Sequence, residues 1–180
     1  GSLGLGISSA IGGDDASGDD KGEGEILHSV VSLIKSDDGK IQSIMIDEIE
    51  PHIAFSSSGA YLGSSGLISA RSSSVKNEGG KTFKEEAEIF EMEAMGKTLD
   101  EIKSLIDKRE ESGGLLSKGV TIDLDNFYPA IKRAYDSASV KVTGVMTAAI
   151  GLMSTAEGTD AKGSENGKAT VKTGICAMAV

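Results

Sequence analysis

The sequence predicts an α+β domain, an antiparallel sheet of several hairpins with about three helices packed on one face. Three observations favour this class. Short β-rich runs alternate with turns rich in Gly and Asp, capping motifs introduce helical periodicity in the middle of the chain, and the opening segment recurs near the end. A chain of 180 residues can bury one core, and aliphatic residues must dominate it because aromatic residues make up only 4%.

The recurring segment predicts a repeat. Residues 6–12 return as residues 145–151, an offset of about 139 residues, and each copy leads into an acidic, Gly-rich stretch and then a β-rich run. We therefore expect residues 1–140 to form one α+β repeat unit and residues 141–180 to begin a second. The strands of this second segment are expected to complete the sheet or to pair with a neighbouring molecule.

An acidic loop and a first hairpin are expected after the opening segment. Residues 13–25 mix Asp and Glu with Gly, which is typical of a solvated loop. Residues 26–34 and 41–46 are β-rich, and Asp38-Gly39 between them supplies the positive φ angles of a tight turn.

A second hairpin and a long loop complete the first half of the chain. Residues 52–55 and 60–62 flank a Ser- and Gly-rich turn, and Pro51 is expected to interrupt the ladder before them. Residues 63–80 are rich in Ser and Gly and predict a long loop.

Two capping boxes predict two helices in succession. Thr82 with Glu85 and Thr98 with Glu101 each place an acidic side chain three residues after a threonine cap. Gly113-Gly114 ends this pair of helices. Apolar residues then fall on one face of each helix: Phe83, Ala87, Phe90 and Ala94 on the first, and Leu99, Ile102 and Ile106 on the second.

A short strand and a third helix are expected next. The alternating apolar residues of 120–124 predict the strand. Asp125 or Asn126 is expected to cap the helix, with Pro129 tolerated in its first turn. Its buried face is predicted to consist of Phe127, Ile131, Ala134 and Tyr135.

Two strands are expected to close the chain, over residues 140–150 and 170–180, with an acidic Gly-rich loop between them. Cys176 lies in the apolar run 175–180 and is expected to be a small buried hydrophobe. Since it is the only cysteine, it excludes a disulfide within the chain and argues against a zinc site.

Charge restricts the partners. A net charge of -10 would repel nucleic acid and anionic membranes and disfavours phosphate-rich ligands. No stretch approaches the ~18 apolar residues of a membrane span. Gly1-Ser2 is typical of a cleaved affinity tag, so we expect a signal peptide or lipid anchor to be absent from these residues. Acidic, Ser- and Gly-rich loops suit an extracellular or cell-surface protein of a bacterium and equally a soluble cytoplasmic one.

No motif identifies a reaction or a metal site. The weakly suggestive aspartates are Asp14, Asp15, Asp19 and Asp20, but their spacing matches no EF-hand loop, so we expect no metal and no need for calcium. The Gly-rich segments 4–6, 80–82 and 96–98 lack the other glycines of dinucleotide- or phosphate-binding loops. His28 and His52 fall in predicted strands without a second histidine or a cysteine nearby, and the hydrolase motif Gly-x-Ser-x-Gly is missing. We name no catalytic residue.

Four segments give the chain a resemblance to repeat proteins of anaerobic Firmicutes that are usually expected to be secreted or lipid-anchored. The family has no established activity, although some members are loosely described as flavin-binding. The chain departs from that pattern because Phe90 and Met95 stand where tryptophans are expected. The four segments are Gly4-Leu5-Gly6-Ile7-Ser8-Ser9-Ala10-Ile11-Gly12, Asp38-Gly39-Lys40-Ile41, Gly96-Lys97-Thr98-Leu99-Asp100-Glu101-Ile102, and Val120-Thr121-Ile122 through to Ala134-Tyr135.

These observations favour a non-catalytic, extracellular structural module that self-associates end to end through β-strand pairing, as a component of the cell envelope. The alternative is a flavin-binding electron-transfer module that carries FMN, which the resemblance implies. A covalent flavin would need the acceptor sequence Ser-Gly-Ala-Thr, but Ser58-Gly59-Ala60 is followed by Tyr61. The candidates for stacking on a flavin ring are Tyr61, Phe90, Phe127 and Tyr128.

Overall fold

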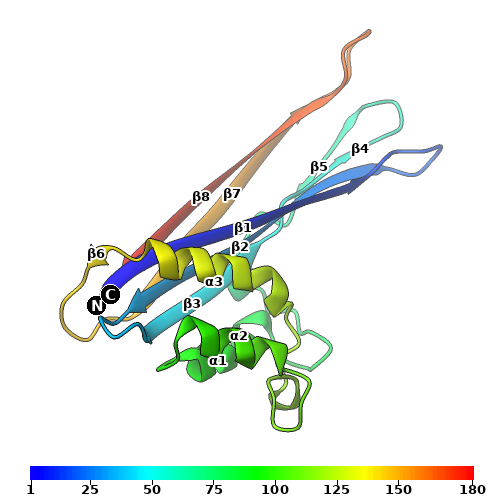
Figure 1. Cartoon of the computed structure of the whole chain (residues 1–180). Coiled ribbons are helices and arrows are strands. Elements are labelled where there is room, and N and C mark those ends of the chain that lie inside the picture. Colours follow the sequence, from blue (N-terminus) through cyan, green and yellow to red (C-terminus); the bar gives the residue numbers. More distant parts are fainter.

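The computed structural model describes all 180 residues and has three layers (Figure 1). A six-stranded sheet forms the middle layer, three helices cover one of its faces, and a separate two-stranded hairpin covers the other. The α+β class, the antiparallel sheet and the three helices on one face are therefore confirmed.

Two long strands organise the sheet. Strand β1 (Ser2–Asp14) pairs along its whole length with β2 (Gly22–Lys35). The other edge of β2 is shared by β3 (Ile41–Ile49) and β4 (His52–Phe55). The hairpins expected at 26–46 and 52–62 are both confirmed.

Two short strands lie at the edges of this sheet. Strand β5 (Tyr61–Ser65) pairs with β4, and β6 (Val140–Lys141) pairs with the beginning of β1. The strand order along the sheet is β5-β4-β2-β1-β6, with β3 also beside β2.

The helices follow the capping motifs. Helices α1 (Phe83–Ala94) and α2 (Leu99–Asp107) each begin after a complete capping box, at Thr82 and Thr98. Helix α3 (Leu124–Ser137) packs against β1 and β2, and single 3₁₀ turns occur at Ala70–Ser72 and Leu116–Lys118.

The core lies between the helices and the sheet. It is mainly aliphatic, with Phe90 and Phe127 as its fully buried aromatic side chains. The sheet contributes Val31, Leu33, Ile41, Ile44 and Ile46 to this core.

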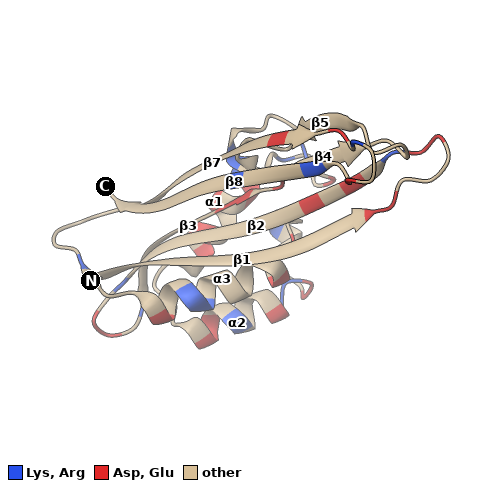
Figure 2. Ribbon diagram, turned by 90° about the horizontal axis from the view of Figure 1, so that it is seen from above, with Lys and Arg blue, Asp and Glu red and all other residues tan.

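The last two strands form the third layer. Strand β7 (Ala148–Thr159) pairs only with β8 (Lys168–Ala179), and the hairpin runs alongside β1 and β2 (Figure 2). Three hairpins, β1–β2, β4–β5 and β7–β8, extend beyond the helices at the same end of the molecule (Figure 1).

Several expected boundaries are wrong for one reason, since strand pairing continues through glycines. The loop predicted at 13–25 shrinks to the residues between Asp14 and Gly22, because Gly12, Gly13 and Gly24 pair within the ladder. In the same way β7 and β8 reach further toward their tip than strands 140–150 and 170–180 would. The strand expected at 140–150 is also wrong at its beginning, because β6 ends at Lys141, β7 begins at Ala148 and no strand lies between them.

The segment before α3 also differs from the expectation. No strand forms over 120–124, and the helix is capped by Asp123, whose side chain accepts a hydrogen bond from the amide of Asp125. Asp125 and Asn126 therefore lie inside the helix. Pro129 falls in the second turn rather than in the first.

Candidate functional site

Hairpin β7–β8 resembles hairpin β1–β2, since each pairs two strands of 12 to 14 residues, and we refer to them as the second and the first copy. An isolated bridge closes each tip, Ser17–Asp20 in the first copy and Lys162–Glu165 in the second. These bridges set an offset of about 145 residues, which corrects the offset of about 139 expected from the sequence. The structural offset aligns identical residues: Gly6 with Gly151, Ser9 with Ser154, Asp15 with Asp160, and Gly18 with Gly163.

Corresponding faces of the two hairpins are turned toward each other. Side chains alternate between the faces of a strand, and in β8 every second residue is partly buried, among them Val171 and Ile175. On the opposing sheet, Val30 and Ile34 are buried but do not belong to the core under the helices. The amide of Ala148 also donates a 3.0 Å hydrogen bond to the hydroxyl of Ser43. The two copies therefore bury a second apolar layer between them.

The opposite faces of the two hairpins differ. In the first copy this face carries α3, and a Cβ atom at Gly6 would overlap the carbonyl oxygen of Ala130. In the second copy the corresponding face is bare, with Met153 63% exposed and Met178 42% exposed. Since Met178 occupies the position of the fully buried Leu33, the same place in the hairpin is core in one copy and surface in the other.

Cys176 lies on this bare face. Its thiol is free and exposed, so the burial expected from the sequence is wrong. The run 175–180 alternates between the inner and outer faces of β8, and Cys176 points outward with Met178. A continuous apolar run concealed that alternation.

The long outer edge of β8 is unpaired. Thr147 and Val180 exchange both backbone hydrogen bonds, at 2.7 and 2.9 Å. Because hydrogen-bonded and non-hydrogen-bonded pairs alternate along an antiparallel ladder, Cys176 directs its backbone groups toward β7, whereas Ile175 and Ala177 direct theirs away from it. These outward groups have no strand partner in the chain.

The outer edge of β1, which corresponds to the outer edge of β7, is covered at its beginning. The carbonyl of Leu3 accepts a hydrogen bond from the amide of Ser139, at 3.2 Å. The hydroxyl of Ser137 donates to the carbonyl of Leu5 at 3.1 Å, and Arg133 donates to the carbonyl of Ile7. The end of α3 and the residues after it thus occupy the edge that β7 leaves free.

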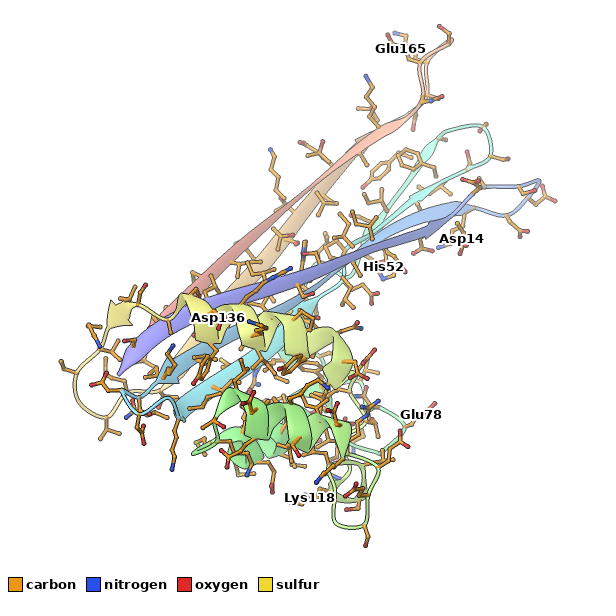
Figure 3. All side chains as sticks on the ribbon, in the orientation of Figure 1. Asp14, His52, Glu78, Lys118, Asp136 and Glu165 are labelled. Atoms are coloured by element: carbon orange, nitrogen blue, oxygen red, sulfur yellow. The ribbon has the colours of Figure 1, made fainter.

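The three hairpin tips are tied together at the end away from the helices. The hydroxyl of Ser57 donates to the carbonyl of Gly18 at 2.7 Å, and the amide of Ala161 donates to the carbonyl of Gly59 at 2.9 Å. Tyr61 also donates its amide hydrogen to the carboxylate of Asp160, at 2.8 Å. These bonds hold β7–β8 against the rest of the molecule. Figure 3 labels Asp14 and Glu165 near the two longer tips.

An acidic cleft of about 640 Å³ lies between the sheet and the beginning of α3. Glu48, Glu50 and Asp123 line it, together with the apolar side chain of Leu27. Burial raises the pKa of Glu48 to about 7, and the carboxylates of Glu50, Asp47 and Asp123 raise it further. Lys76 is the basic residue of the lining, but no cation lowers the pKa of Glu48.

Glu86 lies behind the lining of this cleft, bonded to three of its residues, and has a structural role. It is fully buried, and its carboxylate accepts hydrogen bonds from the amides of Thr121 and Ile122, at 2.5 and 2.9 Å. Asn77 donates a further bond to it at 3.2 Å. These bonds fasten the segment before α3 to α1, so Glu86 is fully engaged and unavailable for chemistry.

A histidine surrounded by glutamates lies next to the cleft. Nδ1 of His52 is 2.9 Å from Glu23 and 3.6 Å from Glu25, and Nε2 is 3.6 Å from Glu50. Glu25, Glu50 and His52 lie close enough together to share a cation. The sequence did not predict this group, because pairing of β4 with β2 brings its members together from distant positions. Figure 3 shows His52 where the sheet leaves the helices.

The residues considered from the sequence do not form a single site. Asp14, Asp15, Asp19 and Asp20 lie at the exposed tip of β1–β2 and are not part of the group around His52. The four aromatic candidates for a flavin are also dispersed. Phe90 and Phe127 are buried in the helical core, Tyr128 is near Lys103, and Tyr61 packs against Phe55 at the far end.

Comparison of the chain with protein-family models, curated proteins and solved structures finds no match. None of its helices is long and apolar enough to cross a membrane. We therefore infer the function from the geometry of the duplicated hairpins.

Proposed function

We propose that this protein is a non-catalytic extracellular structural or interaction module that self-associates end to end through β-strand pairing. The observation that carries the proposal is the unpaired outer edge of β8, which runs over Lys168–Ala179. A strand edge of this length presents a row of free amide and carbonyl groups, and such a row is a template for a strand of another molecule.

The character of the edge supports this proposal. Proteins that avoid association protect their edge strands with bulges, prolines or charges, or keep them short. Strand β8 pairs with β7 without any bulge and contains no proline, and its only charged residues are Lys168 and Lys172, near the tip. By contrast, the outer strands β5 and β6 are short.

The shape and charge of the molecule indicate how copies would meet. The hairpins run along the long direction of the molecule (Figure 2). Contacts that repeat head to tail without closing produce filaments. A net charge of -10 opposes association at low ionic strength, so salt should favour it. Acidic loops rich in Ser and Gly are compatible with a cell-surface location.

The test blocks the edge without removing the hairpin. Ala177→Pro deletes an amide hydrogen that points away from β7 and leaves the β7–β8 ladder intact. We expect the unmodified chain to increase in mass with concentration in light scattering, and the proline variant to remain monomeric. The matched control is Ala177→Val, which keeps the amide and should associate as the unmodified chain does.

Two outcomes would contradict the proposal: a chain that stays monomeric at high concentration and salt, or a proline variant that associates as well as the valine control. Truncation before β7 is a poorer test. It would expose Val30, Ile34 and Ile49, whose burial outside the helical core depends on the third layer. Aggregation through that apolar surface would conceal the loss of the edge.

A further inference from the structure

The two copies of the hairpin have different neighbours in the structure. Strand β2 continues into β3, the helices and β6, and these elements cover its outer edge and one face. Strand β8 has the same position in the second copy, yet its edge and the equivalent face are bare. The first copy therefore shows which kind of structure the second copy is shaped to receive.

The backbone of the second copy matches that arrangement. The even-numbered residues of β2 direct their backbone groups toward β3. The hydrogen bond from the amide of Ile26 to the carbonyl of Pro51 shows the same direction for the adjoining part of this edge. With the offset of about 145 residues, the even-numbered residues of β2 correspond to the odd-numbered residues of β8, which direct their backbone groups outward. A strand like β3 can thus pair with β8 in the register that it adopts on β2.

The side chains of the bare face also correspond. Gly151 stands at the position of Gly6, where the missing side chain admits the backbone of α3. Cys176 and Met178 replace Val31 and Leu33, both of which face the helical core. Ala149 replaces Gly4 and carries a Cβ, so a helix would sit farther out at this end of the hairpin.

Charge complementarity favours an acidic partner for this face. The offset places Lys172 at the position of Leu27, which lines the cleft beside Glu48, Glu50 and Asp123. A second unit packed on β7–β8 would bring its own copy of these carboxylates onto Lys172. Lys172, which lies 3.9 Å from Glu157 in the single chain, would there add a second cation to the Lys76 of the cleft. Figure 2 shows basic segments on β8 where β2 carries acidic ones.

We propose that the outer face and edge of β7–β8 bind the β3-to-α3 layer of a further repeat unit, so that one hairpin is shared by two successive units. This inference goes beyond the proposed function, because edge pairing can join complete chains, whereas the shared hairpin also needs a helical layer that is free to cover its face. In the shared arrangement, Cys176 lies opposite Ile46 and Met178 opposite Ile44 of the second unit, as Val31 and Leu33 do in the first. A separate complete molecule cannot supply this layer, because its own β1–β2 hairpin already occupies it.

The experiment appends a second copy of residues 36–180 directly to Val180, the residue that corresponds to Lys35. The appended copy carries Cys176→Ser, so that the only thiol lies on the shared hairpin. The rate at which Ellman's reagent modifies this thiol is compared with the rate in the unmodified 180-residue chain, where Cys176 is exposed. We expect the reaction in the tandem protein to be at least ~100-fold slower, because modification would require local opening of the new interface.

A matched pair of variants in the shared hairpin tests the face itself. Met178→Lys places a charge at the position of Leu33 and should restore rapid reaction of the thiol. Thr155→Lys occupies the position of Ala10, which is exposed beyond the helices, and should leave the protection unchanged. In the single chain both positions are on the surface, so both variants should fold.

Equal thiol reactivity in the tandem and single chains would overturn the inference, whether the appended copy is folded elsewhere or unfolded. Protection that develops in the single chain as its concentration rises would also overturn it, because the face would then bind another complete molecule. These readouts are separate from the edge test. Protection of the thiol in the tandem protein would stand even if the single chain were monomeric.

Discussion

Hairpins β1–β2 and β7–β8 have the same pattern but different surroundings. The first is covered on both faces, by α3 and by the second hairpin, and the second is covered on one face only. Strand pattern alone therefore does not decide which face becomes core. The helical face of the first hairpin is covered by elements that come after β2 along the chain, namely β3 and the helices.

The largest loss of stability should come from Leu33, the buried member of the equivalent positions Leu33 and Met178. Leu33→Ala removes a fully buried side chain from the helical core and should lower the free energy of unfolding by about 3 kcal/mol. Met178→Ala, at the same place in the second hairpin, should cost less than about 1 kcal/mol because the side chain is 42% exposed. Urea denaturation of both variants measures the difference. Similar costs would mean that the second face is already covered in the isolated chain.

A pair of glycines tests the backbone contact. Gly6→Ala places a Cβ against the carbonyl oxygen of Ala130, so that α3 must move, and we expect a loss of about 2 kcal/mol. Gly151→Ala meets only the sulfur of Cys176, at 2.5 Å, and this side chain can turn away. Its effect should remain within about 1 kcal/mol. Thermal unfolding of the two variants compares them, and a larger cost for Gly151→Ala would contradict the proposed difference between the faces.

The two hairpins differ in charge at the acidic cleft: the first places Leu27 beside Glu48, and the second carries Lys172 at the position of Leu27. The pKa of Glu48 rises from its ordinary value of 4.5 to about 7 on folding, so the folded state favours the protonated form. This contribution to stability is fully present below pH 4.5 and is lost as the pH rises from 4.5 to about 7. Glu48→Gln should therefore raise the free energy of unfolding at pH 8 by about 1–2 kcal/mol and have little effect at pH 4.

Leu27→Lys copies Lys172 into the first hairpin and should act in the same direction, because it places a cation beside Glu48. Denaturant titrations at the two pH values measure both variants. An equal effect of Glu48→Gln at pH 4 and pH 8 would show that its carboxyl group titrates in the folded protein as it does in the unfolded chain.

The smallest effect is expected at the tips. Asp160→Ala removes the acceptor of the hydrogen bond from the amide of Tyr61 and should cost about 1 kcal/mol. Asp15→Ala, at the equivalent position of the first tip, should be neutral within about 0.5 kcal/mol because Asp15 is exposed. Hydrogen exchange at the amide of Tyr61 should become faster only in the first of these variants. Unchanged exchange there would show that Asp160 does not hold the tips together.

Local signals predicted the parts of the fold that depend on neighbouring residues. The two capping boxes and the Asp38-Gly39 turn act within a few residues, and each lies where it was expected. The ends of the long strands could not be predicted this way. Gly22 and Gly24 have little intrinsic preference for a strand. Gly24 is held in the ladder by β1 on one side and β4 on the other, and Gly22 is held by β4.

Of the candidate site, the sequence predicted that the opening segment recurs near the end of the chain, but not how the residues of the two hairpins correspond. Sequence similarity indicated that the ends of the chain are related, but the match of residues 6–12 to residues 145–151 placed the copies out of register. The correct register gives the outward direction of Cys176 and Met178 and makes Gly151 the equivalent of Gly6. The alternation of Lys168, Thr170 and Lys172 with small or apolar residues was the signal that could have fixed it.

The second hairpin has an unpaired edge that is reserved for a neighbour, and hydrogen exchange of the β8 amides measures this most directly. At low protein concentration, the amides of Thr173, Ile175 and Ala177 should exchange rapidly, whereas the equivalent amides of β2, which bond to β3, should be protected. Raising the concentration should slow exchange at these three amides before it affects the rest of the chain. Protection at every concentration would mean that the edge is already paired within one molecule, and rapid exchange at every concentration would mean that no neighbour pairs with it. Either result would contradict the account.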